Sequence, residues 1–148
     1  MIFITEVPIE MTFKPLETDN VYIICRQVNG TYQYYCVVDC LGGSIQCDDC
    51  KSLLENDLSE IIIRHPKGSE MSIHVQNGLY SVGIVDEEQG IIYYYDNKNG
   101  QEGSAELHGK TFPLHMISQS KDTVYMMIEY FIQTGLPFKT MNWIDEEF

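Results

Sequence analysis

Four of the five cysteines lie close enough in the sequence to bind one zinc ion together. Cys36, Cys40, Cys47 and Cys50 have the spacing C-x3-C-x6-C-x2-C, and four thiolates can hold zinc tetrahedrally. Only the last pair has the spacing of a zinc knuckle, and the first two would lie about 13 Å apart on an extended strand. Two carboxylates between Cys47 and Cys50 disfavour the thiolate that redox chemistry needs. Free thiols are therefore the favoured interpretation, with a zinc- or thiol-dependent protein as the alternative.

The remaining residues contain no recognisable catalytic motif. The four histidines form neither H-E-x-x-H nor any pair at metal-binding spacing, and there is no G-x-S-x-G, Walker loop or G-x-G-x-x-G. We therefore expect a protein that is not an enzyme, with no cofactor and no bound metal.

The charge of the chain limits its partners. Its 148 residues include 22 acidic and 9 basic side chains, which gives a net charge of -13. Such a field repels nucleic acids and anionic lipids. No apolar stretch is long enough for a membrane span or a signal peptide, and the odd number of cysteines argues against a disulfide framework. We expect one cytoplasmic domain over residues 1–148.

Carboxylates beside tyrosines suggest a surface that binds a basic protein. Acidic groups accelerate the capture of a basic partner, and aromatic side chains then hold it. The alternative is that Tyr93 and Tyr95 face the core and that the acids only maintain solubility. The candidate binding residues are Asp86, Glu87, Glu88, Tyr93, Tyr94, Asp96, Asp145, Glu146 and Glu147.

The first half of the chain predicts strands around one short helix. Asn29-Gly30 has the composition of a tight hairpin turn, because both residues tolerate positive φ. Three leucines give a short segment after the cysteines the apolar stripe of a helix. The predicted strands are Ile2–Glu6, Val21–Val28, Thr31–Asp39 and Ile61–Arg64, and the predicted helix is Asp48–Leu58.

A three-stranded antiparallel meander is predicted next. Apolar residues alternate with polar ones over Met71–Val75, which indicates a strand with one buried face. Asn77-Gly78 is a strong hairpin signal that connects this strand to Leu79–Val85. An acidic loop, Asp86–Gly90, then leads into a third strand, Ile91–Asp96.

The clearest helix is predicted over Lys121–Thr134. Its apolar residues repeat at i, i+3, i+4 and i+7, and Ser120 is suited to cap its first turn. Gly135 fits the left-handed position after a helix, and Pro137 prevents its continuation. A last strand is predicted over Thr140–Ile144. The fold class is thus α+β, a mostly antiparallel twisted sheet packed against this C-terminal amphipathic helix and the short helix.

The C-terminal third resembles a known family. Phe112-Pro113-Leu114, a helix that ends in Phe131-Ile132-Gln133-Thr134-Gly135, then Pro137 and Trp143, resemble the closing signature of the first immunity-protein family of bacterial polymorphic toxin systems. The upstream order is also similar, with a short helix, a strand and a meander, so the resemblance covers roughly residues 51–146.

The resemblance implies a small α+β protein that binds and neutralises a cognate toxin domain. Members of that family protect their own cell from toxins that sibling cells deliver, as in contact-dependent growth inhibition, and the paired toxins include nucleases and deaminases. The signature residues are structural, with Gly135 and Pro137 ending the helix and Phe131 and Trp143 packing. Combined with the net charge, this predicts an acidic inhibitor of a basic toxin C-terminal domain. A generic acidic adaptor is the remaining alternative.

Overall fold

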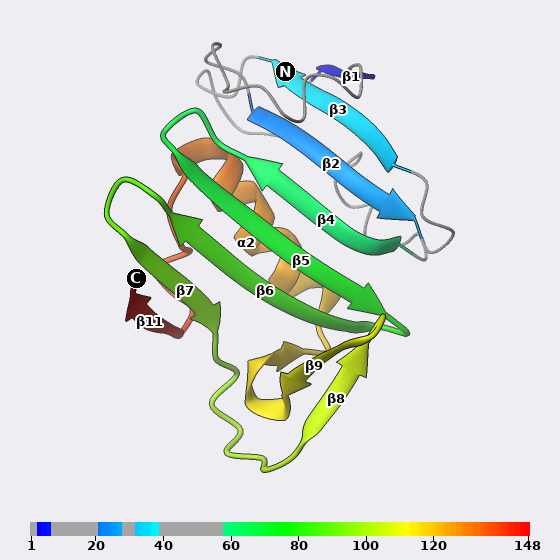
Figure 1. Cartoon of the computed structure of the whole chain (residues 1–148), viewed down its shortest axis with the longest axis vertical. Helices are drawn as coiled ribbons and strands as arrows, with labels where there is room; N and C mark the ends of the chain where they lie inside the picture. Colours follow the sequence, from blue (N-terminus) through cyan, green and yellow to red (C-terminus); the bar gives the residue numbers. More distant parts are fainter. Residues whose placement is uncertain (1–2, 7–20, 28–31, 39–57) are drawn as a thin grey trace.

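The protein is built on one large antiparallel sheet (Figure 1). The computed structural model describes residues 3–6, 21–27, 32–38 and 58–148. Within them, nine strands form a sheet whose main path is β1-β3-β2-β4-β5-β6-β7-β11. The strands on this path are β1 (Phe3–Glu6), β2 (Val21–Gln27), β3 (Tyr32–Val38), β4 (Leu58–Arg64), β5 (Ser69–Gln76), β6 (Leu79–Asp86), β7 (Ile91–Tyr95) and β11 (Trp143–Glu147).

The chain between β7 and the helix forms a second, smaller unit. A two-stranded hairpin of β8 (Ser104–Leu107) and β9 (Lys110–Pro113) is followed by a 3-10 turn, η2 (Leu114–Met116). Strand β10 (Ile117–Ser118) then pairs with Tyr80 and Ser81 of β6, while β7 pairs with residues 83–86 of the same strand. The returning chain therefore extends the sheet beside β6 beyond the end of β7.

The core lies between one face of the sheet and helix α2 (Lys121–Thr134). Alternate residues of β5 are buried along the whole strand, as the sequence predicts. Apolar side chains of neighbouring strands continue this face, because antiparallel pairing places them directly opposite one another. The helix contributes Val124, Met127, Ile128, Phe131 and Ile132 to the same core.

Local signals define both ends of α2. The Ser120 side chain accepts a hydrogen bond from the Thr123 backbone N–H at 3.2 Å, and Asp122 lies in the first turn, where a carboxylate suits the positive end of the helix dipole. At the other end Gly135 has φ +71° and its N–H donates to the Phe131 carbonyl. The bounds of this helix match the sequence prediction.

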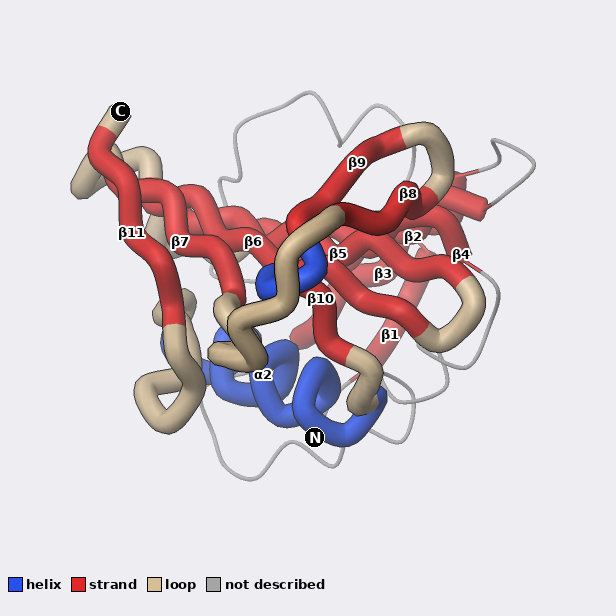
Figure 2. Tube along the Cα trace, turned by 90° about the horizontal axis from the view of Figure 1, so that it is seen from below, coloured by secondary structure: helices blue, strands red, loops and turns tan. Residues whose placement is uncertain are grey.

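The face of the sheet opposite α2 carries the β8–β9 hairpin at one end. Figure 2 shows the hairpin and the helix on opposite sides of the sheet. The hairpin rests on β5, where the Phe112 and His74 rings are 5.0 Å apart and Lys110 Nζ lies 3.2 Å from His74 Nε2. We call this side of the sheet the open face.

The fold class and the meander are confirmed, and several boundaries are corrected. The predicted last strand, Thr140–Ile144, has the wrong bounds, because residues 138–141 form a turn in which the Met141 N–H donates to the Phe138 carbonyl. The strand instead covers Trp143–Glu147, so the acidic end of the sequence is an edge strand of the sheet. Asp86 ends β6 rather than beginning a loop, and β7 stops at Tyr95.

Two further corrections concern segments with weak local signals. Leu58, predicted as the end of the short helix, is the first residue of β4, and residues 48–57 of that helix lie outside the described part of the chain. The predictions from periodicity also missed β8, β9 and β10. Among the described helices, none is long and apolar enough to cross a membrane.

Candidate protein-binding surface

Pairing between β7 and β11 brings two distant acidic segments together. Glu147 lies opposite Ile91 and Glu146 opposite Ile92. Beyond the strand, the Phe148 N–H donates to the Gly90 carbonyl at 2.9 Å. The last residues of β11 therefore lie beside the turn that follows β6, although more than fifty positions separate these segments in the sequence.

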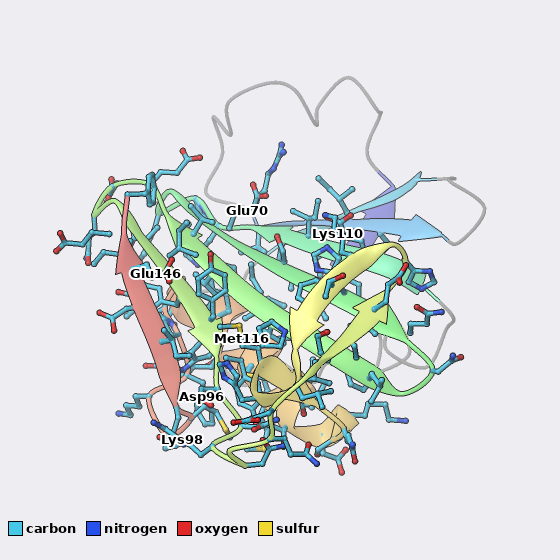
Figure 3. All side chains as sticks on the ribbon, turned by 60° about the horizontal axis from the view of Figure 1, so that its bottom comes forward. Glu70, Asp96, Lys98, Lys110, Met116 and Glu146 are labelled. Carbon is cyan, nitrogen blue, oxygen red and sulfur yellow. The ribbon has the colours of Figure 1, made fainter. Side chains whose placement is uncertain are left out.

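We call the resulting surface the acidic corner. Figure 3 shows Glu146, one of its members, on β11 at the edge of the sheet. All of its carboxylates belong to exposed residues. The ion pairs found within the described part of the chain use other acids, so these remain unneutralised there. The members are Glu87, Glu88, Asp145, Glu146 and Glu147.

Asp86, a predicted binding residue, is buried and is not part of the exposed corner, although its hydrogen bond stabilises the adjacent turn. It is only 9% exposed and lies opposite Ser69 on the side of the sheet that faces α2. Its Oδ1 accepts a hydrogen bond from the Gln89 N–H at 3.1 Å, and the Glu87 N–H donates to the Gly68 carbonyl. These bonds fix the turn that presents Glu87 and Glu88 to solvent.

Asp96 lies at the opposite end of β7 and is separate from the corner. Its Oδ1 accepts a hydrogen bond from the Lys98 N–H, and Lys98 Nζ and His115 Nδ1 each lie 3.6 Å from its carboxylate oxygens. Figure 3 shows Asp96 and Lys98 close together below the sheet. The backbone hydrogen bond, more than the cationic neighbours, holds the pKa of Asp96 below its ordinary value. This carboxylate already has partners within the protein.

The two predicted tyrosines point to different sides of β7. Tyr93 faces α2 and packs against the core, as Tyr95 does more completely, which is the alternative considered for this pair. Tyr94 is opposite Gly83 on the open face, and its Cδ1 is 4.0 Å from where a Gly83 side chain would begin. Both tyrosines are half-buried, but only Tyr94 lies on the open face, where a partner could contact it.

One aromatic residue at the corner is absent from the residues predicted to bind a partner. Phe148 is 68% exposed, although its backbone is fixed to Gly90. Exposure of a large apolar ring beside carboxylates is typical of binding surfaces. The signal that could have found it is the adjacency of Phe148 to the acidic run, but that run was interpreted as following the last strand rather than forming it.

A shallow depression of about 700 Å³ lies near Asp96, between the loop after β7 and the first turn of α2. Asn97 holds its wall, donating through Nδ2 to the carbonyls of Leu114 and Ile117 at 2.9 and 2.7 Å. Asn99 is bonded to Gln101 through both its amide oxygen and its amide nitrogen. These amides stabilise the loop itself, so we assign no ligand to the depression.

The zinc and thiol alternatives fall largely outside the described residues. Cys40, Cys47 and Cys50 lie in undescribed segments, and only the backbone of Cys36 is described, on β3. The described residues contain no cluster of three or more potential metal ligands. Cys25 is buried in the core, where burial raises the pKa of its thiol to about 12. That thiol stays protonated and packs as a small apolar group.

Comparisons with known proteins identify the fold but no family. No protein-family model matches the chain, and no curated protein sequence does. The crystal structure of a hypothetical protein from Neisseria gonorrhoeae is similar to it, with a TM-score of 0.60 and 18% sequence identity. The match covers 83% of this chain and 93% of that chain. At this identity the likeness concerns the arrangement of strands and helix, and it carries no activity or partner.

Proposed function

We propose that this protein is an immunity protein that binds a basic toxin domain at the acidic corner and neutralises it without catalysing a reaction. The resemblance of the C-terminal third to the first immunity-protein family supplies the class of partner. The observation that carries the proposal is the convergence of Glu87 and Glu88 with β11, because this arrangement concentrates exposed carboxylates on one rigid edge.

Electrostatics supports a toxin that acts on nucleic acid. Such toxins bind phosphates in cationic clefts, and a fixed group of carboxylates imitates that charge. Because the corner lies on strand β11 and on a hydrogen-bonded turn rather than on a free tail, little conformational entropy is lost when the partner arrives. The corner therefore serves rapid capture as well as tight binding.

Apolar groups beside the corner provide the contact area that charges alone do not. Ile92 and Tyr94 of β7 and Ile144 of β11 share the open face with Glu146, and all three are half-buried. Phe148 adds an exposed ring at the margin. Interfaces commonly combine an apolar centre with a charged rim, and this part of the sheet has both.

Two matched charge reversals test the proposal. Glu146→Lys/Glu147→Lys changes the corner, whereas Glu102→Lys/Glu106→Lys changes two exposed acids next to or on the β8–β9 hairpin by the same total charge. The partner to test is a candidate toxin domain encoded by an adjacent gene, and the absence of any such gene would count against the proposal. At low salt we expect the corner variant to lower the association rate constant about tenfold or more, and the hairpin variant to lower it much less.

Co-expression of the toxin domain with each variant measures protection of the cell. We expect the unmodified protein and the hairpin variant to restore growth and the corner variant to restore it poorly. Equal losses for both variants would mean that only the total charge matters, and the corner would not be the binding site. Failure of the unmodified protein to bind or protect would refute the immunity function itself.

A further inference from the structure

Strand β11 is an edge strand whose outer side can be assigned residue by residue. The Asp96 N–H donates to the Asn142 carbonyl at 3.0 Å, and the Phe148 N–H donates to the Gly90 carbonyl at 2.9 Å. In antiparallel pairs, hydrogen-bonded positions alternate with non-bonded ones. Both bonds involve an even-numbered residue that flanks β11, Asn142 or Phe148, and the register between them is unbroken. Ile144 and Glu146 therefore also direct their backbone groups toward β7.

The odd-numbered residues of β11 direct their backbone groups away from the sheet. Trp143, Asp145 and Glu147 each present one N–H and one C=O along the outer edge. No strand within the described ranges pairs with this edge, because β11 ends the sheet order there. The edge is thus a preformed template for one additional strand.

The side chains on this edge select the partner. Asp145 and Glu147 are on the side that faces α2, Glu146 is on the open face, and all three are exposed. Two copies of β11 could pair antiparallel with Asp145 opposite Asp145, or with Asp145 opposite Glu147. In either register carboxylates lie opposite carboxylates, which destabilises the pair. A strand that carries lysine or arginine meets opposite charges at the same positions. The acids therefore disfavour self-association and favour a basic strand.

We propose that the partner adds a basic strand to the outer edge of β11, extending the sheet by main-chain hydrogen bonds. This inference rests on the proposed function, since the basic strand belongs to the toxin domain. It goes further by specifying how the two proteins join. The added strand runs antiparallel, like every pair in the sheet, and places basic side chains opposite Asp145, Glu146 and Glu147 and aliphatic ones opposite Trp143 and Ile144.

A synthetic peptide tests the geometry without changing the protein. The probe is acetyl-Thr-Lys-Lys-Lys-Val-Val-Thr-amide, which places three lysines opposite the three acids in an antiparallel register. Each of two derivatives carries two N-methyl groups on alternate backbone nitrogens. In one derivative both methylated nitrogens face β11, and in the other both face away from it. We expect methylation of the inward nitrogens to weaken binding about tenfold, because two hydrogen bonds are lost, and methylation of the outward nitrogens to have little effect.

Amide hydrogen exchange of the whole protein, followed by NMR, locates the added strand. Without the peptide, we expect the N–H groups of Asp145 and Glu147 to exchange at least tenfold faster than those of Ile144 and Glu146. With saturating peptide, the first two should become protected and the other two should change little. Binding without this protection, or equal effects of the two methylated peptides, would overturn the proposal, as would an edge-paired dimer of the protein itself.

Two substitutions at one position carry the test to the toxin domain. Asp145→Asn removes the charge and keeps the outward N–H, whereas Asp145→Pro removes both and leaves the bonds to β7 in place, since edge strands tolerate proline there. We expect the proline variant to bind the toxin domain about tenfold more weakly than the asparagine variant. Equal binding by two folded variants would overturn strand addition while leaving immunity intact. Peptide pairing without toxin binding would refute the immunity function instead.

Discussion

Two polar regions lie side by side at one end of the sheet, and they differ in whether their polar side chains are buried or exposed. In the first, the β4–β5 turn meets the end of α2. His65 is 4% exposed, its Nδ1 accepts a hydrogen bond from the Lys67 N–H, and its ring lies edge-on to Phe131. Ser69 Oγ donates to the Gly135 carbonyl at 2.7 Å. We call this group of contacts the helix lock.

In the second region, the acidic corner, side chains are exposed and have no ionic partner within the described chain. The two regions are nevertheless connected, because Ser69 lies opposite Asp86 and the Gly68 carbonyl accepts from the Glu87 N–H. The hydrogen bonds of the buried Ser69 Oγ and His65 Nδ1 help to fix one arrangement of the helix on the sheet. Exposed polar groups without partners cost little stability and remain available to another molecule.

Replacing Gly135 with alanine should produce the largest loss of stability. An added Cβ would lie 2.8 Å from His65 Nδ1 and 3.1 Å from Ser69 Oγ, and φ of +71° is itself unfavourable for alanine. We expect the free energy of unfolding to fall by about 3 kcal/mol, measured by urea denaturation.

Gly100→Ala is the matched control. Gly100 has φ of +67° but an added Cβ would meet nothing within 4 Å, so this variant carries the backbone strain without the clash. Its loss should be about 1 kcal/mol. Equal losses for the two variants would show that the contacts of the helix lock add nothing to the conformational preference of glycine.

Features determined by nearby residues were predictable from the sequence. Ser120 and Gly135 define the ends of α2 through contacts within three or four positions, and both were correctly predicted. Asn77 and Gly78 likewise adopt the positive φ values that their hairpin turn requires. Gly135 also shows where such reasoning stops, because its contacts with His65 and Ser69 join segments about 66 positions apart.

The strand that forms the acidic corner could not be placed by local preference. Aspartate and glutamate are depleted in strands, so residues 145–147 read as a polar end rather than as β11. Their pairing with β7 depends on a distant segment, and charge is tolerated there because β11 is an edge strand. The structure shows five of the candidate acids to be exposed, whereas Asp86 is buried and Asp96 is paired with Lys98. Sequence alone could not separate these two from the rest.

The helix lock should also make stability depend on pH. Burial, more than the charge of Lys67, lowers the pKa of His65 from its ordinary value of 6.5, although the Ile132 backbone opposes the shift. The unfolded chain therefore takes up a proton before the folded protein does. Stability should be highest above about pH 6.5 and should fall as the pH decreases through that value, until the lowered folded pKa is passed.

Urea denaturation at about pH 7.5 and at about pH 5.5 measures this effect, because the two pH values lie on either side of the ordinary histidine pKa. The pKa of His74 is also lowered, mainly by burial, so His74→Gln is needed to isolate His65. We expect the decrease to persist in that variant. Its disappearance would assign the pH dependence to the contact between His74 and the hairpin, and an increase in stability at the lower pH would contradict the predicted sign.

The smallest effect on stability is expected at the acidic corner. Glu87→Gln/Glu146→Gln/Glu147→Gln removes three exposed carboxylates that make no ion pair in the described part of the chain. The free energy of unfolding should therefore change by no more than about 0.5 kcal/mol, with relief of repulsion favouring a small gain. Association with the toxin domain should slow at low salt and be affected less at high salt, because screening already weakens the field there. A loss of stability as large as that of Gly135→Ala would instead make the corner a structural element like the helix lock, and the contrast between the two regions would fail.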